Sequence, residues 1–389
     1  MRLLSIFGSR SDVIKMGPIA QALASHAGFE SIMCIASQDR FITGNDLSLF
    51  NINPDYRLDP MRGNRSLNEI CAHWFTTLEP VLQACRPDRV LVHGAGITAM
   101  AASLAAYRRR IPIAHVEAGL PTGNPARPQL RDAHRHIIDS VGDLLFAPSL
   151  GAAAHLAAEQ VPGRVLLTGN TVIDAARHAN TRILADPALQ ERLDAGLPAI
   201  PAGRRLLVVT GYHHGPAGSG FAAICQVLAK LTRRDDVHIV YPVRLNPRLR
   251  GPIQTTLNGR NNIDLVEPLD YLHFIRLLQR AHMVLTDSGT VQEEAPALGK
   301  PVLVMCDASK RPEAVAAGTV RLINGDWINI AGAINRLLDN PAPHLDFVRL
   351  SNPYGDGLAS TRIVAALAGQ PVQPFSPPPQ PTTSLHGHA

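Results

Sequence analysis

Short apolar runs alternate with amphipathic stretches along the chain, and this alternation restricts the fold more than any other feature of the sequence. Helical patterns, such as Leu67, Ile70, Trp74, Leu78 and Leu82, lie between the runs. Strand–helix–strand repetition predicts an α/β fold with a parallel, doubly wound sheet. In the first half the predicted strands are residues 3–7, 31–36, 89–93, 111–116, 144–147 and 165–168.

The pattern starts again in the second half of the chain. The predicted strands there are residues 205–210, 237–241, 263–266, 284–286, 301–305 and 320–323. We therefore expect two Rossmann-like doubly wound domains, over residues 1–170 and 171–357. Residues 169–201 separate the two sets of strands. They begin as a predicted helix and end in a Pro-bracketed linker, residues 197–201.

The end of the chain differs in composition from both halves. We expect a helix over residues 358–369 that packs back on the first domain. Residues 370–389 are rich in Pro and carry almost no apolar periodicity, so they are predicted to form a disordered tail. If the two domains face a cleft, the carboxyl ends of both sheets meet there, and a nucleotide is the expected ligand.

The charge balance excludes some partners. The formal charge is +5 with a pI of about 9.1, and the basic residues are scattered apart from the run at residues 108–110. A solvated helix end accounts for that run better than a nucleic-acid patch, because nucleic-acid binders concentrate basic charge on one face. We expect no nucleic-acid partner, whereas a phosphorylated, acidic small molecule suits the charge.

The five cysteines are odd in number and no pair has CxxC spacing, so neither a disulfide framework nor a zinc site is expected. The apolar part of the N-terminus is too short for a signal peptide. No uncharged apolar run is long enough to span a bilayer. These features predict a cytoplasmic protein with no membrane partner.

Two loops after predicted strands carry cations or a carboxylate. Gly8, Arg10 and Lys15 lie where the first strand turns into a helix, so the two cations are candidates for phosphate binding, although a surface Arg and Lys are common at such a place. There is no GxGxxG sequence, which argues against a dinucleotide site. Glu117 closes the strand before Gly119 and is predicted either to do acid/base work in the cleft or to cap the next turn.

A third loop is the most specific. Ser288 and Gly289 follow a predicted strand and open a helix, so the hydroxyl and backbone N–H groups suit a diphosphate. Glu294 follows in the same helix and can accept both hydroxyls of a ribose. Arg311 precedes Pro312 at another helix start, where simple capping is the alternative interpretation.

These motifs together resemble those of the bacterial non-hydrolysing UDP-N-acetylglucosamine 2-epimerases. The resemblance extends from Met1 to about residue 368 and rests on residues 6–8, 13–16, 115–120, 168–174, 285–311 and 352–357. It implies two Rossmann-like domains in a GT-B-like arrangement, a homodimer, and interconversion of UDP-GlcNAc and UDP-ManNAc for surface or exopolysaccharide synthesis. It also implies that no nicotinamide cofactor or metal is used.

The resemblance further implies roles for single residues. It places Glu117 in the catalytic set. UDP binding, by the second domain above all, is implied for the positions that match the family's binding residues, namely Arg10, Lys15, Phe274, Ser288, Gly289, Glu294 and Arg311.

Several positions depart from the family pattern. Ala95, Arg131 and Tyr212 stand where the family has Asp, Glu and His, and His213 is the residue that could substitute for the missing histidine. Asp39 and Arg244 replace histidines that bind a second, activating UDP-GlcNAc in the family. Three hypotheses account for the catalytic changes: an impaired relative that still binds UDP, altered chemistry, or local reading errors in the recorded sequence.

Overall fold

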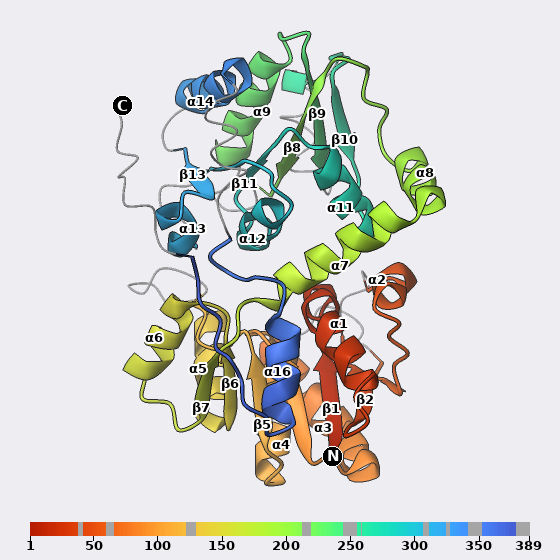
Figure 1. The fold of residues 1–389 in the computed structure, drawn as a ribbon, viewed down its shortest axis with the longest axis vertical. Helices are drawn as coiled ribbons and strands as arrows, with labels where there is room; N and C mark the ends of the chain where they lie inside the picture. The colour runs from red at the N-terminus through yellow and green to blue at the C-terminus, as the bar shows by residue number, and fades with distance from the viewer. Residues whose placement is uncertain are drawn as a thin grey trace. The chain divides into compact units, whose positions relative to one another are not determined.

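A computed structural model of the chain describes residues 1–37, 42–59, 66–121, 130–211, 219–243, 255–257, 259–305, 311–323, 327–340 and 352–378. The chain forms two compact units (Figure 1). Unit 1 combines Met1–His178 with Tyr354–Pro377, and unit 2 is built from Ala179–Pro353. Among the described residues, no helix is long and apolar enough to cross a membrane.

Unit 1 contains a seven-stranded parallel sheet in the order β3-β2-β1-β4-β5-β6-β7. Successive strands are added outward from β1 on one side and from β4 on the other, so the strand order reverses between these two. Ligands of doubly wound sheets bind beyond the carboxyl ends of the strands at such a point. The strands are β1 (Arg2–Phe7), β2 (Glu30–Ile35), β3 (Tyr56–Arg57), β4 (Arg89–His93), β5 (Ile113–Val116), β6 (Leu144–Ala147) and β7 (Arg164–Leu167).

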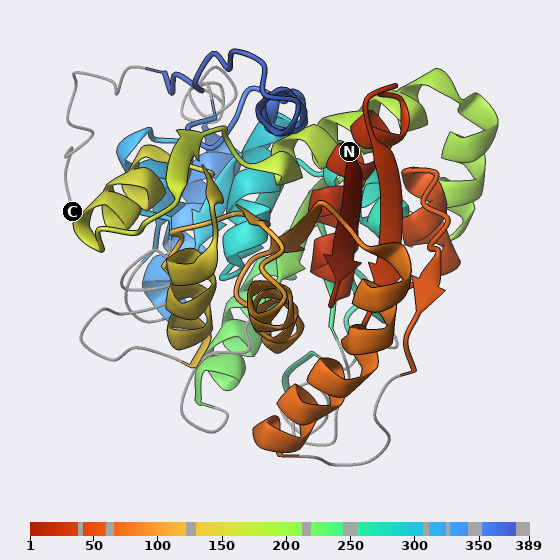
Figure 2. The same ribbon diagram turned by 90° about the horizontal axis from the view of Figure 1, so that it is seen from below.

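Helices cover both faces of this sheet (Figure 2). Leu4 and Val92 belong to a core with Trp74 of α3 and Ile138 of α5 on one face. On the other face α1 packs against α16. The helices are α1 (Arg10–Ala24), α2 (Gly44–Leu49), α3 (Leu67–Cys85), α4 (Ile97–Arg108), α5 (Leu130–Val141), α6 (Leu150–Ala158), α7 (Thr171–Ala185) and α16 (Ala359–Leu367).

Unit 2 contains a six-stranded parallel sheet in the order β10-β9-β8-β11-β12-β13, with the reversal between β8 and β11. The strands are β8 (Arg205–Thr210), β9 (Val237–Pro242), β10 (Ile263–Val266), β11 (Met283–Thr286), β12 (Val302–Val304) and β13 (Val320–Leu322). Each of the two sheets thus has its own candidate ligand-binding site, at the carboxyl ends of the strands where the order reverses.

The core of unit 2 lies between the sheet and two helices, because Ile224 of α9 and Ile334 of α14 pack with Leu207 and Leu285. Two other helices, α11 and α12, contact strands β8 and β12 respectively. The helices are α8 (Pro187–Ala195), α9 (Ser219–Leu231), α11 (Tyr271–Arg280), α12 (Gly289–Ala297), α13 (Pro312–Ala316) and α14 (Trp327–Asp339).

The predicted α/β class with two doubly wound parallel sheets is confirmed, and every strand predicted from the sequence is present. Strand β3 was not predicted. It has only two residues, paired with Cys34 and Ile35 of β2, and such a short edge strand leaves no periodicity in the sequence.

The stretch predicted to separate the halves is mostly helical. The expected boundary at residue 170 lies just before α7, whereas the division between the two units falls inside this helix, after His178. Helix α8 follows, with Asp186 as its N-cap and Pro187 at its first position. Leu197 in the Pro-bracketed segment is buried, so this segment packs on the protein as well as connecting its parts.

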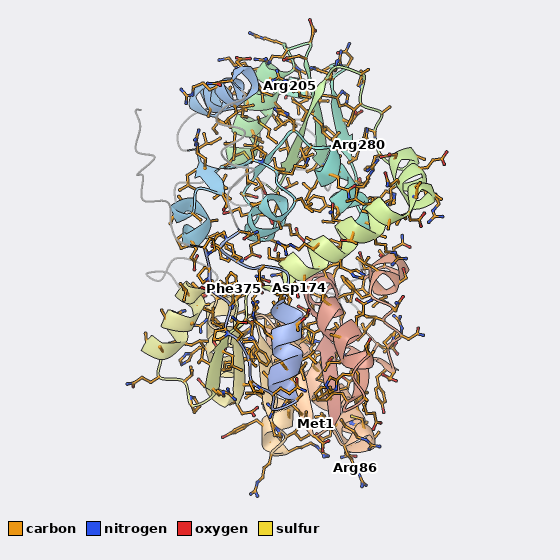
Figure 3. All side chains as sticks on the ribbon, viewed as in Figure 1. Met1, Arg86, Asp174, Arg205, Arg280 and Phe375 are labelled. Carbon is orange, nitrogen blue, oxygen red and sulfur yellow. The ribbon has the colours of Figure 1, made fainter. Side chains whose placement is uncertain are left out.

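The C-terminal segment of unit 1 is held by a buried carboxylate of α7. Asp174 accepts hydrogen bonds from the backbone N–H groups of Ala359 (3.2 Å) and Ser360 (2.8 Å) at the start of α16 (Figure 3). Burial raises the pKa of Asp174, against the opposing hydrogen bonds from Ser360 and Ala359. The first turn of α16 is therefore capped by a residue that is distant in the sequence.

The segment after Gln370 departs from the expectation of a disordered tail. Phe375 is 4% exposed, and its backbone N–H donates a 2.9 Å hydrogen bond to Leu167 at the end of β7. Arg362 lies over the Phe375 ring, 5.6 Å from its centroid. A buried aromatic side chain and hydrogen bonds to Leu167 and from Arg362 thus hold a stretch that has no apolar periodicity. Residues 379–389 lie outside the described part.

Candidate active site

Glu117 lies directly after β5 and is the centre of a polar cluster in unit 1. Its φ of 66° is left-handed, which is rare for a residue with a Cβ and is associated with functional sites. Its Oε1 pairs with Lys15 Nζ and accepts a 2.9 Å hydrogen bond from Asn170 Nδ2. Its Oε2 lies 3.1 Å from His93 Nε2. Glu117 therefore contacts residues that lie at or beyond the carboxyl ends of three other strands, β1, β4 and β7.

Asp12 supports the same cluster from α1. Its Oδ1 lies 2.7 Å from His93 Nδ1, and its Oδ2 accepts a 2.8 Å hydrogen bond from the backbone N–H of Gly8. Ser9 caps α1 by accepting from the Asp12 N–H. Burial works to lower the pKa of His93, but the negative charge of Glu117 and the hydrogen bond with Asp12 outweigh it and raise that pKa.

A second polar network is centred on His115, which lies in β5 two residues before Glu117. His115 is fully buried and joins Asp139 Oδ1 (2.6 Å) to the carbonyl of Gly94 (2.8 Å). Arg135 binds Asp139 at 2.7 Å and makes a bidentate contact with Glu159 at 2.9 and 2.7 Å. This network ties the ends of β4 and β5 to α5 and α6.

Gly8 and Arg10, which follow β1, both lie close to residues distant in the sequence. Gly8 does not adopt a positive φ. Its need for glycine comes from close packing, since a Cβ there would lie 2.6 Å from the Cβ of Thr98. Arg10, predicted to bind phosphate, makes a bidentate ion pair with buried Asp46 at 2.8 and 3.1 Å. A role for Arg10 in UDP binding stays a prediction.

The positions that depart from the family pattern are partly described. Ala95 is buried and follows Gly94, while Arg131 is exposed in the first turn of α5. His134 is hydrogen-bonded to the Ala95 backbone, and its buried Nδ1 has no partner among the described residues. Burial lowers the pKa of His134; the Ala95 hydrogen bond opposes this and the charge of Arg131 adds to it.

Four residues named in the sequence analysis lie outside the described residues. They are Asp39, Tyr212, His213 and Arg244. The role of His213 as a catalytic substitute is not addressed by the structure.

In unit 2 the point of strand reversal is marked by two threonines. Thr210 at the end of β8 and Thr286 at the end of β11 share a 2.7 Å hydroxyl contact. Gly211 follows with φ 84°, and a Cβ there would lie 1.7 Å from Oδ1 of Asp287. Only glycine fits at this position, because the Gly211 backbone lies directly against Asp287. The ends of β8 and β11 can therefore lie close together.

The predicted phosphate loop lies at this edge. Ser288 is the N-cap of α12, but its side chain makes no capping hydrogen bond, and its N–H donates to Thr286 Oγ1 at 3.0 Å. Arg311 lies against Gly289, where an added Cβ would be 3.3 Å from the guanidinium carbon. The Arg311 guanidinium therefore lies next to the N-terminus of α12, where Gly289 has no side chain to fill the space. This arrangement suits the binding of an anion.

Two buried carboxylates on α12 have different partners. Glu293 is fully buried and binds Arg311 Nε at 2.5 Å. Glu294 accepts a 2.9 Å hydrogen bond from the hydroxyl of Tyr271 on α11. Phe274, also on α11, is half-buried. The structure thus places Ser288, Gly289 and Arg311 in one cluster and orients Glu294 from the next turn.

Sequence reasoning missed His93, Asp12 and Asn170 around Glu117, and Glu293 and Tyr271 in unit 2. The signal for the first group was present: His93 ends a strand, Asn170 lies in a strand-to-helix loop, and Asp12 lies in the first turn of the helix after such a loop. Glu293 and Tyr271 sit inside helices, where polar residues are common, and nothing in the sequence marks them.

Comparison with known proteins identifies the family to which the chain belongs. The sequence profile described as UDP-N-acetylglucosamine 2-epimerase matches residues 21–368. The chain belongs to the UDP-N-acetylglucosamine 2-epimerase family. The family suggested by the motifs of the sequence is thereby confirmed, and the chain is a member of a family of isomerases.

Relatives within the family match over almost their whole length. The UDP-N-acetylglucosamine 2-epimerase of Yersinia pestis is 42% identical over 374 residues, which cover 96% of this chain and 100% of that protein. A structure of UDP-GlcNAc 2-epimerase from Neisseria meningitidis bound to UDP-GlcNAc has 38% identity and a TM-score of 0.88, covering 95% of this chain and 100% of that one.

A more distant relative has the same fold. The UDP-GlcNAc 2-epimerase of Methanocaldococcus jannaschii, in complex with UDP-GlcNAc and UDP, has 26% identity and a TM-score of 0.78, covering 95% of this chain and 100% of that one.

Proposed function

We propose that this protein interconverts UDP-GlcNAc and UDP-ManNAc. A base removes the C2 proton while the bond from C1 to the UDP oxygen breaks, which leaves 2-acetamidoglucal and UDP. UDP then adds back to C1 while C2 receives a proton on the other face. The reaction needs positioned acid and base groups and a firm hold on the diphosphate.

The observation that carries the proposal is the setting of Glu117. It is the carboxylate at the carboxyl end of β5; its backbone is left-handed, and its side chain contacts Lys15, His93 and Asn170. A strained and oriented carboxylate at a sheet edge suits proton transfer at a sugar carbon. We assign this step to Glu117.

UDP binding is assigned to unit 2. Ser288 and Gly289 at the start of α12 and the guanidinium of Arg311 supply donors for the diphosphate. Glu294, oriented by Tyr271, supplies the acceptor for the ribose hydroxyls. Phe274 and the cations Arg10 and Lys15 complete the proposed binding set.

The biological setting follows from the same proposal. We infer a cytoplasmic homodimer that supplies ManNAc-type precursors for surface or exopolysaccharide. Its substrate is a nucleotide sugar, which is available in the cytoplasm, and the family resemblance supports the dimer.

The test is incubation with UDP-GlcNAc in deuterated water, with UDP-ManNAc formation and deuterium entry at C2 followed by NMR. Conversion with C2 exchange supports the proposal. Glu117→Gln should lose both signals while it still binds UDP, and Glu191→Gln, an exposed glutamate on α8, is the matched control. Wild-type levels of exchange in Glu117→Gln would remove Glu117 from the mechanism.

A second candidate function is that of a UDP-sugar-binding relative with impaired catalysis. The observation that favours it is Ala95, a buried methyl group two positions after His93, where the family pattern has a carboxylate. A methyl group cannot transfer a proton. Under this alternative UDP binds with normal affinity, while C2 exchange stays at the background rate.

A further inference from the structure

We propose that His93 is a positioning residue for Glu117 and is held in its charged form by Asp12. This inference rests on the proposed function in one respect, namely that Glu117 takes part in the proton transfer. The assigned role of His93 is to supply a fixed positive charge at one oxygen of the Glu117 carboxylate.

The first step of the argument is that Asp12 is itself fixed. One carboxylate oxygen lies 2.7 Å from His93 Nδ1 and the other accepts the Gly8 N–H at 2.8 Å. The Asp12 backbone N–H is bound by Ser9 Oγ at 3.3 Å. Both oxygens are engaged and the backbone is capped, so the Asp12 carboxylate is held in place at one edge of the His93 ring.

The second step is the charge balance around His93. Among the described residues, the charged groups that face it are Asp12 and Lys15 from α1 and Glu117 from the end of β5, and Asn170 adds a neutral amide. His93 and Lys15 have 4% side-chain exposure, Glu117 11% and Asp12 14%. With a neutral His93, two buried carboxylates face one ammonium group. An imidazolium makes the cluster neutral, and burial of unbalanced charge is costly.

The third step concerns the two oxygens of Glu117. Lys15 binds Oε1, and His93 Nε2 lies 3.1 Å from Oε2. Each oxygen thus has its own cation, which fixes the direction of the carboxylate. The negative charge of Glu117 raises the pKa of His93 more than the hydrogen bond between the two side chains does, so this contact is mainly Coulombic. Its strength therefore depends on the charge of the ring rather than on its shape.

The direct test is an NMR pH titration of the histidine ring carbons, with the His93 signal assigned by its loss in His93→Gln. In the wild type His93 should remain an imidazolium well above the ordinary histidine value of about 6.5. Asp12→Asn keeps an acceptor for Gly8 but removes the charge, and should lower the midpoint by about 1–3 pH units. Asp264→Asn, at the carboxylate paired with His238 in unit 2, is the matched control and should leave the His93 midpoint unchanged.

This titration needs no catalytic turnover. A neutral His93 at pH 7 in the wild type, or an unchanged midpoint in Asp12→Asn, would overturn the inference even if the enzyme is active. Conversely, a raised midpoint in a chain that does not convert UDP-GlcNAc would overturn the proposed function and leave the charged pair established. Circular dichroism of each variant shows whether it is folded.

The second test is the pH profile of C2 exchange. A group with a raised pKa keeps its charge until the pH rises through that value, so the alkaline limb of the wild-type profile should follow the His93 midpoint. Asp12→Asn should move this limb to lower pH, and His93→Gln should abolish this pH dependence and lower the rate. A purely structural role would change the rate without moving the limb, and that result would contradict the inference.

Discussion

The Tyr271 hydroxyl donates a 2.9 Å hydrogen bond to Oε1 of Glu294, and both groups are buried. This bond joins α11 to α12 and fixes the direction of the carboxylate proposed to bind the ribose. The two residues are 23 positions apart in the sequence.

Removal of the Tyr271 hydroxyl should weaken UDP binding. Glu294→Ala removes the charged acceptor proposed for the ribose and should cost about 1.5–3 kcal/mol of UDP binding. Tyr271→Phe keeps the ring and the carboxylate but removes the bond that orients Glu294, so its loss of UDP affinity should be smaller. Calorimetric titration with UDP measures both. Arg336→Ala, an exposed residue on α14, is the control. Equal affinities for all variants would exclude Glu294 from the UDP site.

Gly211→Ala should be far more harmful than Gly203→Ala. The two glycines have φ of 84° and 82°, so the backbone strain, about 1–2 kcal/mol, is shared. Only Gly211 has Asp287 within reach of a Cβ, whereas Gly203 has open space. Urea unfolding of both variants isolates the clash, and the double change Gly211→Ala with Asp287→Gly should recover part of the loss. Similar unfolding free energies for the two single variants would contradict the close approach.

The Arg135–Glu159 ion pair should stabilise the folded protein near neutral pH and lose this effect as the solution becomes acidic. The Arg135 hydrogen bonds lower the pKa of Glu159 to about 2, against the opposing effect of burial. A carboxylate with a depressed folded-state pKa stabilises the protein above its unfolded value of about 4.3, and this contribution is lost as the pH falls from there toward 2. Urea unfolding between pH 6 and 3 should show a weaker pH dependence in Glu159→Gln. An identical slope in the two proteins would refute the coupling.

Phe375→Ala should destabilise unit 1 by about 3–5 kcal/mol, the usual cost of removing a buried phenylalanine. The ring is 4% exposed and lies under Arg362. A chain that ends after Gln370 should lose at least as much. A chain that ends after Pro378, which keeps Phe375, is the reference for that truncation. Equal melting temperatures for all three chains and the wild type would show that the segment does not contribute to stability.

Restoration of the family residues should raise the exchange activity. Ala95→Asp, Arg131→Glu and Tyr212→His together return groups able to transfer protons, and each such group typically contributes about 10²–10⁴-fold, although the effects do not add. C2 exchange in deuterated water is the measurement, with UDP affinity as the control for folding. A repaired variant that binds UDP and remains inert would favour true divergence of this chain.

The sequence predicted the sheets well because buried parallel strands are continuous apolar runs, such as residues 205–210. It also predicted that Glu117 closes a strand. The sequence did not predict which side chains pair with one another within the sites. Arg10 pairs with Asp46 36 positions away and His93 with Asp12 81 positions away. Periodicity describes only near neighbours in the sequence, so it cannot assign such partners.

The capping of Ala359 and Ser360 by Asp174 spans up to 186 positions of the chain. During synthesis, the ribosome therefore completes all of Ala179–Pro353 before the last helix of unit 1 can dock. Until then the Asp174 carboxylate of α7 lacks the N–H groups of Ala359 and Ser360 that it binds in the folded protein, and the face of α1 that α16 covers is not packed by this helix. Unit 2 can fold on the ribosome while unit 1 is still incomplete, so the half of the protein that is made first is the last to be finished.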